Sequence, residues 1–323
     1  MLTPDQPALI LAPMDGITDA PMRALQGEVG SFTFAVSEFV RVANHVIPAR
    51  AFQREIPECL NTGCTPTGMP VAVQILGGDA EMMALSAVNA ARAGARCIDI
   101  NFGCPAPTVN RHDGGATLLN SPCRIREIVS AVRSAVPADI PVSAKIRLGW
   151  SSIDAVYENA QMAAEGGASW LTIHARTRVQ GYAPPVFYSP IREVRESLRI
   201  PVIANGDLFS LDDFRRCRDE TGCMHFMIGR GALARPSLSY EIAREMGIAA
   251  REPICDWVEL MSILRMWTER CGITVGPKNV QRMKQWLCLA NRYGEFRAFE
   301  SVKRIDSVAE FFEALKVEIA QAA

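Results

Sequence analysis

The chain has 323 residues and a formal net charge of −1, with 49% hydrophobic and 21% charged residues. This composition supports a sizeable packed core and excludes global disorder, and the length allows one large barrel plus a small appendage. A protein that binds nucleic acid usually carries a net positive charge, so any contact with RNA must come from a local basic patch.

The ten cysteines predict neither a disulfide framework nor a metal site, because no Cys-x-x-Cys pair is present and the nearest pair is Cys59 and Cys64. The first residues lack the basic and apolar segments of a signal peptide. No apolar stretch approaches the roughly 20 residues that span a bilayer. We therefore expect a reduced, soluble, cytoplasmic protein that binds no metal and no membrane.

Eight short apolar segments, rich in β-branched residues, recur through the first three quarters of the chain. They cover residues 9–13, 34–39, 71–77, 97–104, 142–148, 170–175, 202–205 and 226–229. Amphipathic segments at 81–93, 125–136, 155–165, 190–198 and 211–220 separate most of them. This alternation predicts right-handed βαβ units and a (β/α)₈ TIM barrel. A doubly wound sheet is the alternative, but no Gly-x-Gly-x-x-Gly turn follows the first strand.

The pattern changes after about residue 250, where Glu252-Pro253 resembles a linker. Helical segments follow at 256–271, 278–293 and 308–320, and Asp256 is placed to cap the first of them. We predict a catalytic barrel over residues 1–250 and a small all-helical domain over residues 251–323.

The helical tail is locally basic. Between residues 265 and 304, nine basic residues outnumber three acidic ones. Arg282 and Lys284 lie in this run, interleaved with Trp267, Trp286 and Tyr293. Such a segment can attract phosphates and stack on bases. The alternative is a solvated helix face whose aromatic side chains belong to the core.

Polar and special residues cluster just after the predicted strands. They are Met14-Asp15-Gly16, Gln74, Asn101 to Pro105, Lys145, His174 to Arg176, Asn205-Gly206-Asp207 and Gly229-Arg230. In a barrel these positions converge on the carboxyl-terminal rim, where active sites lie. Turns at strand ends account for the glycines. They do not account for Gln74, Lys145 and His174, because an unpaired buried polar group costs about 2–7 kcal/mol.

These rim groups match the chemistry of a flavin mononucleotide. Lys145 offers a positive charge to the electron-rich pyrimidine edge of a reduced flavin, and Gln74 offers both a donor and an acceptor to that edge. Residues 205–207 and 229–230 end the seventh and eighth strands, where barrels commonly bind phosphate, and Arg230 adds a guanidinium fork. His174 either hydrogen-bonds the flavin or has a structural role.

Cys104 is the most distinctive residue of the predicted rim. It lies in the sequence Asn-Phe-Gly-Cys-Pro at 101–105, on a loop constrained by Pro105 and Pro107. A thiol in this place can act as a nucleophile or as an acid. A single cysteine, taken alone, is more often structural.

Six segments resemble, in the same order, the motifs of the tRNA-dihydrouridine synthase family. They lie at residues 12–19, 101–105, 145–149, 174–177, 201–207 and 227–232, and the resemblance runs from about residue 9 to 240. Within that family the chain is most similar to the bacterial branch that acts on uridine 16 of the D-loop. Residues 37–42, 180–182 and 282–286 carry this finer resemblance.

The resemblance implies bound FMN, NADPH as the reductant, and tRNA held through its D-loop by the helical domain. It implies that Cys104 donates a proton to the reduced uracil and that Pro13, Met14 and Asp15 line the flavin site. It further implies contacts to the substrate, which we assign to Arg41, Asn101, Tyr182, Arg282 and Lys284. Two alternatives stay open: an FMN-dependent dehydrogenase of a free pyrimidine-like metabolite, and a tRNA-binding module that has lost catalysis.

Overall fold

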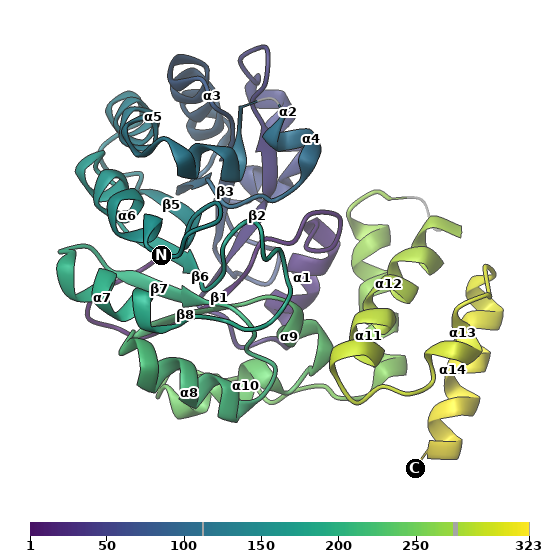
Figure 1. Cartoon of the computed structure of the whole chain (residues 1–323). Helices are drawn as coiled ribbons and strands as arrows, with labels where there is room; N and C mark the ends of the chain where they lie inside the picture. Colours follow the sequence, from purple (N-terminus) through teal and green to yellow (C-terminus); the bar gives the residue numbers. More distant parts are fainter. Residues whose placement is uncertain (112, 274–276, 323) are drawn as a thin grey trace.

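The computed structural model describes residues 1–111, 113–273 and 277–322. Within these ranges, eight parallel strands close into a barrel in the order of the sequence (Figure 1). They are β1 (Ala8–Leu11), β2 (Phe34–Arg41), β3 (Val71–Leu76), β4 (Ile98–Asn101), β5 (Val142–Arg147), β6 (Leu171–His174), β7 (Val202–Asn205) and β8 (His225–Ile228). The predicted TIM barrel is confirmed, and each strand falls within a residue or two of a predicted apolar segment.

The strands are mainly apolar because the barrel buries both of their faces along most of their length. One set of side chains packs in the barrel interior, among them Ile10, Phe34, Ala72, Ile203 and Met227. A larger cluster joins the outer faces of the strands to the surrounding helices. Polar residues inside such strands must find partners within the barrel, and this requirement organises the site described below.

Helices follow most strands and cover the outside of the barrel. They are α1 (Ala20–Val29), α2 (Ala49–Glu55), α3 (Ala80–Ala93), α4 (Pro107–Asn110), α5 (Pro122–Ala135), α6 (Ala155–Glu165), α7 (Ser189–Ser197), α8 (Leu211–Thr221), α9 (Arg230–Ala234) and α10 (Leu238–Glu245). The prediction identified α3 and α5 to α8. It missed α1, which contains Pro21 and Gly27 and is buried along most of its length, so it shows no clear polar face.

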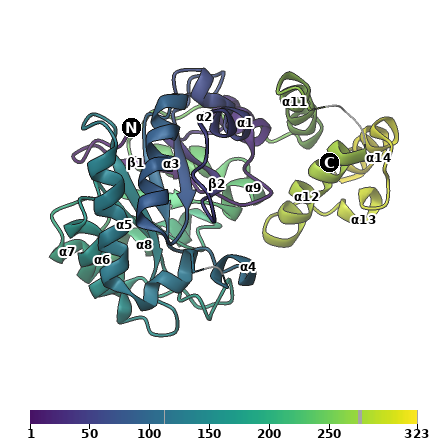
Figure 2. The ribbon, with the colours of Figure 1, turned by 90° about the horizontal axis from the view of Figure 1, so that it is seen from above.

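A helical region lies to one side of the barrel, next to α1 and α9 (Figures 1 and 2). It consists of α11 (Trp257–Arg270), α12 (Pro277–Tyr293), α13 (Phe299–Val302) and α14 (Val308–Ala322). The Asp256 carboxylate caps α11 by accepting a hydrogen bond of 2.8 Å from the Glu259 amide, as predicted. The domain boundary at residue 251 remains our proposal. No helix in the described ranges is long and apolar enough to cross a membrane.

The barrel and the helical region share one hydrophobic cluster, in which Leu25 and Leu233 of the barrel pack with α11 and α12. The Trp286 indole donates to the Leu233 carbonyl at 2.7 Å, and the Trp267 indole donates to the Glu28 carboxylate at 2.6 Å. Both tryptophans are at most 5% exposed. They therefore belong to the core, which confirms for them the alternative interpretation of the tail.

Replacing Trp286 with alanine should destabilise the helical region by about 3–5 kcal/mol, because it removes a buried ring and its hydrogen bond to the barrel. Val317→Ala, at a 53% exposed position of α14, is the matched control and should change stability by less than about 0.5 kcal/mol. Chemical denaturation followed by circular dichroism measures both. Equal effects of the two changes would contradict the packing described here.

Candidate active site

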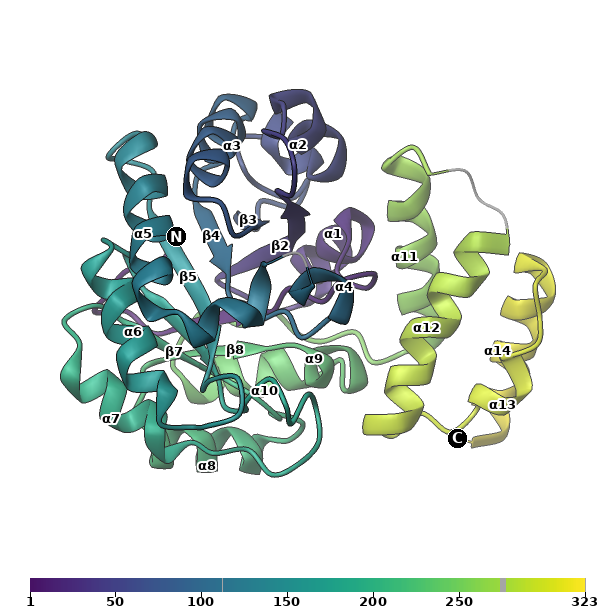
Figure 3. The ribbon, with the colours of Figure 1, turned by 45° about the horizontal axis from the view of Figure 1, so that its top comes forward.

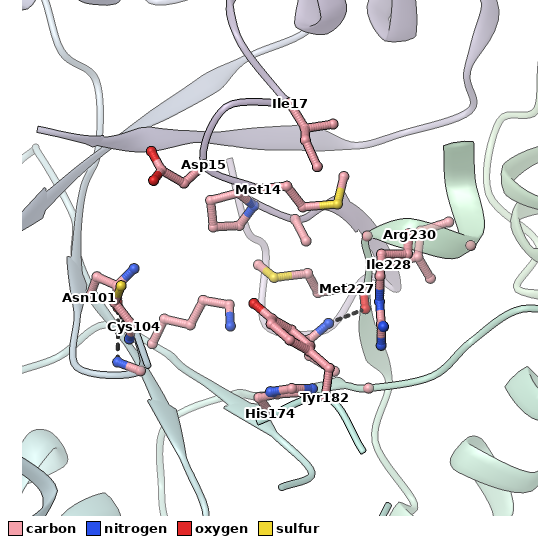
Figure 4. A pocket seen from close by; sticks show the side chains of 18 of the residues that line it. Met14, Asp15, Ile17, Asn101, Cys104, His174, Tyr182, Met227, Ile228 and Arg230 are labelled. Carbon is pink, nitrogen blue, oxygen red and sulfur yellow. Dashed lines mark hydrogen bonds between the residues drawn. The ribbon is translucent and has the colours of Figure 1, made fainter. Parts of the chain in front are cut away.

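A cavity of about 360 Å³ opens where the strands end, and Figure 4 shows its side chains. Its lining includes every residue predicted to bind the flavin: Pro13, Met14, Asp15, Gln74, Lys145, His174, Asn205, Gly206, Asp207, Gly229 and Arg230. Cys104, Asn101 and Tyr182 line the same cavity. Its volume is within the range of about 300–1,000 Å³ typical of ligand pockets.

Two basic side chains, Lys145 and His174, lie on the floor of the cavity. Burial, and then the neighbouring Arg147, lower the pKa of Lys145 to about 8. Burial and the surrounding cations hold the pKa of His174 well below its usual value, so its imidazole is neutral at pH 7. The floor thus offers one titratable cation and one neutral ring, a combination suited to a ligand that carries or acquires negative charge.

The opposite end of the cavity is built around Asp207. Its carboxylate accepts two hydrogen bonds from Arg176 and one of 2.8 Å from Arg230. Gly206 has a φ of +140°, a conformation that favours glycine, and an added Cβ would lie 3.3 Å from the His174 ring. The backbone therefore approaches the cavity closely here. Arg230 also donates to the Tyr293 hydroxyl at 3.2 Å, and its remaining N–H groups can donate to another anion.

Cys104 lies across the cavity from Arg230, next to Asn101 (Figure 4). The Asn101 side-chain oxygen accepts hydrogen bonds from the Gly103 amide at 2.8 Å and from the Cys104 amide at 2.9 Å. Burial is the main cause that raises the pKa of the Cys104 thiol. The thiol is therefore protonated at neutral pH, which suits an acid better than a nucleophile.

The Gln74 and Asn101 amides are occupied mainly within the protein. Gln74 Nε2 donates to the Asp99 carboxylate at 2.7 Å, and Gln74 Oε1 accepts from Asn101 Nδ2 at 2.8 Å. Each NH₂ group keeps one further hydrogen to offer a ligand. For the donor and the acceptor predicted to face the flavin, Gln74 therefore retains one hydrogen and one lone pair, and the contact predicted for Asn101 depends on its remaining hydrogen.

Tyr182 stands at the mouth of the cavity and is 57% exposed. The guanidinium of Arg147 lies 5.3 Å from its ring centre and that of Arg230 lies 4.9 Å away. Arg147 also donates to the Gly103 carbonyl at 2.7 Å and to the Gly181 carbonyl at 2.8 Å. It therefore fixes the loop of Cys104 and the turn of Tyr182 relative to each other.

Sequence reasoning gave no role to several residues of the site. Arg147, Glu38 and Phe209 line the cavity, and Asp99 lies directly beneath it. The sequence does mark Asp99 as an inward-facing residue, since it is a charged residue inside an apolar strand, as Lys145 is. Arg147, a charged residue at the end of β5, is marked in the same way. Their partners on other strands were not visible in the sequence.

The remaining candidates lie outside the cavity lining. Arg41 donates to the Thr108 carbonyl at 3.3 Å. Arg282 forms an ion pair with Asp19, the cap of α1, and Lys284 pairs with Asp306 at 2.8 Å while only 6% exposed. The side chain of Lys278, also in the basic run, is outside the described residues. Contact between tRNA and these side chains stays a prediction.

The fold is shared with solved structures of low sequence identity. Histamine dehydrogenase from Rhizobium sp. 4-9 matches with a TM-score of 0.58 and 13% identity, over 80% of this chain and 49% of that one. Morphinone reductase matches with a TM-score of 0.52 and 16% identity, over 80% and 88% of the two chains. These likenesses place the protein in the (β/α)₈ barrel class, with a cavity at the carboxyl-terminal rim.

Sequence comparison identifies the family. A model described as dihydrouridine synthase matches residues 10–323. The tRNA-dihydrouridine(16) synthase of Pseudomonas putida is 40% identical over 313 residues, covering 96% of this chain and 97% of that protein. The enzyme of the same name from Cupriavidus necator is 47% identical over 285 residues, covering 88% of each chain. The chain belongs to the dihydrouridine synthase family and is a flavin-dependent oxidoreductase that acts on tRNA.

The charge of Lys145 gives a pH dependence. The ammonium is present below its pKa of about 8 and is lost as the pH rises through that value. We expect the affinity of the apoprotein for flavin to fall over pH 7–9 as this charge disappears. Lys145→Met should bind more weakly at pH 7 and should lose this part of the pH dependence, whereas ionisation of the flavin itself affects both proteins. Parallel profiles in a fluorescence titration would contradict this role of Lys145.

Proposed function

We propose that the protein reduces the bond between carbon 5 and carbon 6 of uridine 16 in the D-loop of tRNA, in the cytoplasm, with FMN as the cofactor and NADPH as the reductant. The relatives that span nearly the whole chain bear the name tRNA-dihydrouridine(16) synthase, which supports position 16. The observation that carries the chemistry is a protonated thiol, Cys104, that lines the same cavity as a partly buried cation, Lys145.

The donor set of the cavity fits FMN. Lys145 would face the pyrimidine edge of the ring, where negative charge accumulates on reduction, and the free donor of Gln74 would face the same edge. Arg230 and the close backbone at Gly206 and Gly229 would hold the phosphate. When bound, the flavin supplies hydride to carbon 6 of the uracil.

Cys104 completes the reduction. Addition of hydride at carbon 6 leaves an enolate on the uracil, whose carbon 5 needs a proton. The Cys104 thiol gives that proton and becomes a thiolate, which the positive charges of Arg147 and Arg41 stabilise. Solvent then returns a proton to the sulfur before the next turnover. A raised thiol pKa suits this cycle because the group must start protonated.

The uridine must leave its stack to reach the cavity. Tyr182 is placed to receive it, because its exposed ring is held at the mouth by Arg147 and Arg230 and offers a surface for stacking. The remaining hydrogen on Asn101 Nδ2 can meet a carbonyl oxygen of the base. We propose Tyr182 and Asn101 as the residues that orient the uracil between the flavin and Cys104.

Cys104→Ala should separate the two half-reactions. The variant should keep its flavin and its reduction by NADPH, because neither needs the thiol. Reoxidation of the reduced flavin by tRNA should slow by about 10²–10⁴-fold, since the enolate must wait for a proton from solvent. Stopped-flow absorbance measures both rates. Cys123→Ala, at an exposed cysteine of α5, is the control and should behave as the wild type. Wild-type reoxidation by tRNA in Cys104→Ala would refute the assignment.

Exposed cations should contribute more to tRNA affinity than paired ones. Arg292 is exposed and lies over the ring of Tyr293, whose hydroxyl accepts from Arg230 at the cavity. Arg292→Ala should lower the salt slope of tRNA binding by about 1. Lys284→Ala should lower it less, because Asp306 already neutralises that ammonium. Filter binding over a range of salt concentrations measures both slopes. The opposite order would support the Lys284 contact predicted from the sequence.

A further inference from the structure

A line of buried hydrogen-bonding side chains runs beneath Cys104. The Ser143 hydroxyl donates to Asp99 Oδ1 at 2.6 Å, and Gln74 Nε2 donates to Asp99 Oδ2 at 2.7 Å. Asn101 Nδ2 donates to Gln74 Oε1, and Asn101 Oδ1 accepts from the amides of Gly103 and Cys104. Asp99, Gln74, Asn101 and Ser143 are all at most 8% exposed.

The register of the strands explains why these side chains meet. Gln74 of β3 lies opposite Asp99 of β4, and Asp99 lies opposite Ser143 of β5. Asn101 follows Asp99 by two residues, so it lies on the same face of β4. The line therefore crosses three strands and ends at the loop that carries the thiol.

The direction of each hydrogen bond in this line is set at its ends. Burial raises the pKa of Asp99, whereas the hydrogen bonds from Ser143 and Gln74 and the charge of Lys145 favour its ionised form. As a carboxylate Asp99 only accepts hydrogen bonds, so it requires the NH₂ group of Gln74. Gln74 must then present its oxygen to Asn101. At the other end, two loop amides require the Asn101 oxygen, so Asn101 must present its NH₂ group to Gln74. Both ends of the line therefore require the same orientation of the Gln74 and Asn101 amides, and every hydrogen bond along the line joins a donor to an acceptor.

We propose that Asp99 is a positioning residue for Cys104, which acts by fixing the orientation of the Gln74 and Asn101 amides and, through them, the loop of the thiol. This inference rests on the proposed function, in which the thiol must meet carbon 5 of the uracil. Two other contacts hold the loop independently: Arg147 donates to the Gly103 carbonyl, and the Ala116 amide donates to the Cys104 carbonyl at 3.1 Å. Disturbing the line should therefore displace the loop without unfolding it.

The direction of the line can be broken and then restored. In Asn101→Asp, carboxylates stand on both sides of Gln74, whose single NH₂ group can satisfy only one of them. Adding Asp99→Asn restores the match, because Gln74 can turn its NH₂ group to the new carboxylate at position 101 and accept from the new amide at position 99. The double variant exchanges the two side chains and keeps the net charge of the wild type.

The half-reaction with tRNA is the main measurement. Asn101→Asp should slow reoxidation of the reduced flavin by tRNA at least about tenfold, because a small misplacement of a reacting group is costly. Its reduction by NADPH should change far less. The double variant should recover at least about fivefold over Asn101→Asp. Any direct contact of residue 101 with the base is the same in both proteins, so the recovery reports on the line alone.

A matched control separates hydrogen bonding from charge. Asp99→Leu combined with Asn101→Asp has the same net charge as the double variant Asp99→Asn with Asn101→Asp, but leucine cannot donate to Gln74. Its rate of flavin reoxidation by tRNA should recover less than that of the variant with asparagine at position 99. Equal recovery in the two double variants, or no recovery in the exchange, would overturn the proposal. Wild-type reoxidation in Asn101→Asp would overturn it too.

A second pair of variants covers the case in which Asn101→Asp prevents folding. Gln74→Glu opposes Asp99 with a second carboxylate, and Gln74→Glu with Asp99→Asn restores a donor on each side of position 74. The second protein should again reoxidise its flavin with tRNA faster than the first.

In both series, peptide-resolved alkylation of Cys104 in the flavin-loaded enzyme reports the position of the loop without turnover. The alkylation rate should rise in the mismatched variant and return to the wild-type value in the matched one. Failure of the wild type to reduce tRNA would instead refute the proposed function, and leave the alkylation result to decide the inference.

Discussion

Closure of eight parallel strands into one barrel is the constraint on which the site depends. It brings the carboxyl ends of all strands to a single rim, so residues from Pro13 to Arg230 line one cavity although most of the barrel's sequence separates them. Figure 3 views the barrel with its top turned forward and shows the helical region beside it. Closure also buries the interior, so the polar groups there need hydrogen-bond partners, which neighbouring strands supply. The hydrogen bonds beneath Cys104 satisfy this requirement, and the same bonds orient the reactive loop.

Burial gives the titratable groups of the rim different protonation states, which suit them to different roles. It raises the pKa of Cys104, so that the thiol holds its proton, and it lowers the pKa values of Lys145 and His174. The result is an acid on one side of the cavity and a cation on its floor. Reduction of a pyrimidine needs both, since a hydride donor must be stabilised as it forms and the carbanion that results must be protonated.

Much of this arrangement could be predicted from the sequence, because periodicity identifies strands and a polar residue inside an apolar strand marks an inward position. Gln74, Lys145 and His174 were found in this way. Asp99 and Arg147 were equally visible as exceptions, but their roles depend on contacts with Ser143, Gly103 and Gly181 that only the register and the loops define. The helical tail was harder, because its composition does not reveal that Trp267 and Trp286 face the barrel or that Asp19 and Asp306 neutralise its cations. The charge count over residues 265–304 could not include Asp19, which lies more than 200 residues from Arg282, and it stopped two residues before Asp306.

Reduction of a D-loop uridine by this barrel can be measured on a defined RNA. An unmodified tRNA transcript is incubated with the purified protein, FMN and NADPH, and each nucleotide is then mapped by mass spectrometry of ribonuclease fragments. The account predicts a gain of two hydrogen atoms at uridine 16, and no gain in a transcript that carries cytidine at this position. Reduction at another uridine would contradict the assigned position. No reduction in any transcript, by protein that binds FMN and is reduced by NADPH, would show that the protein does not reduce D-loop uridines.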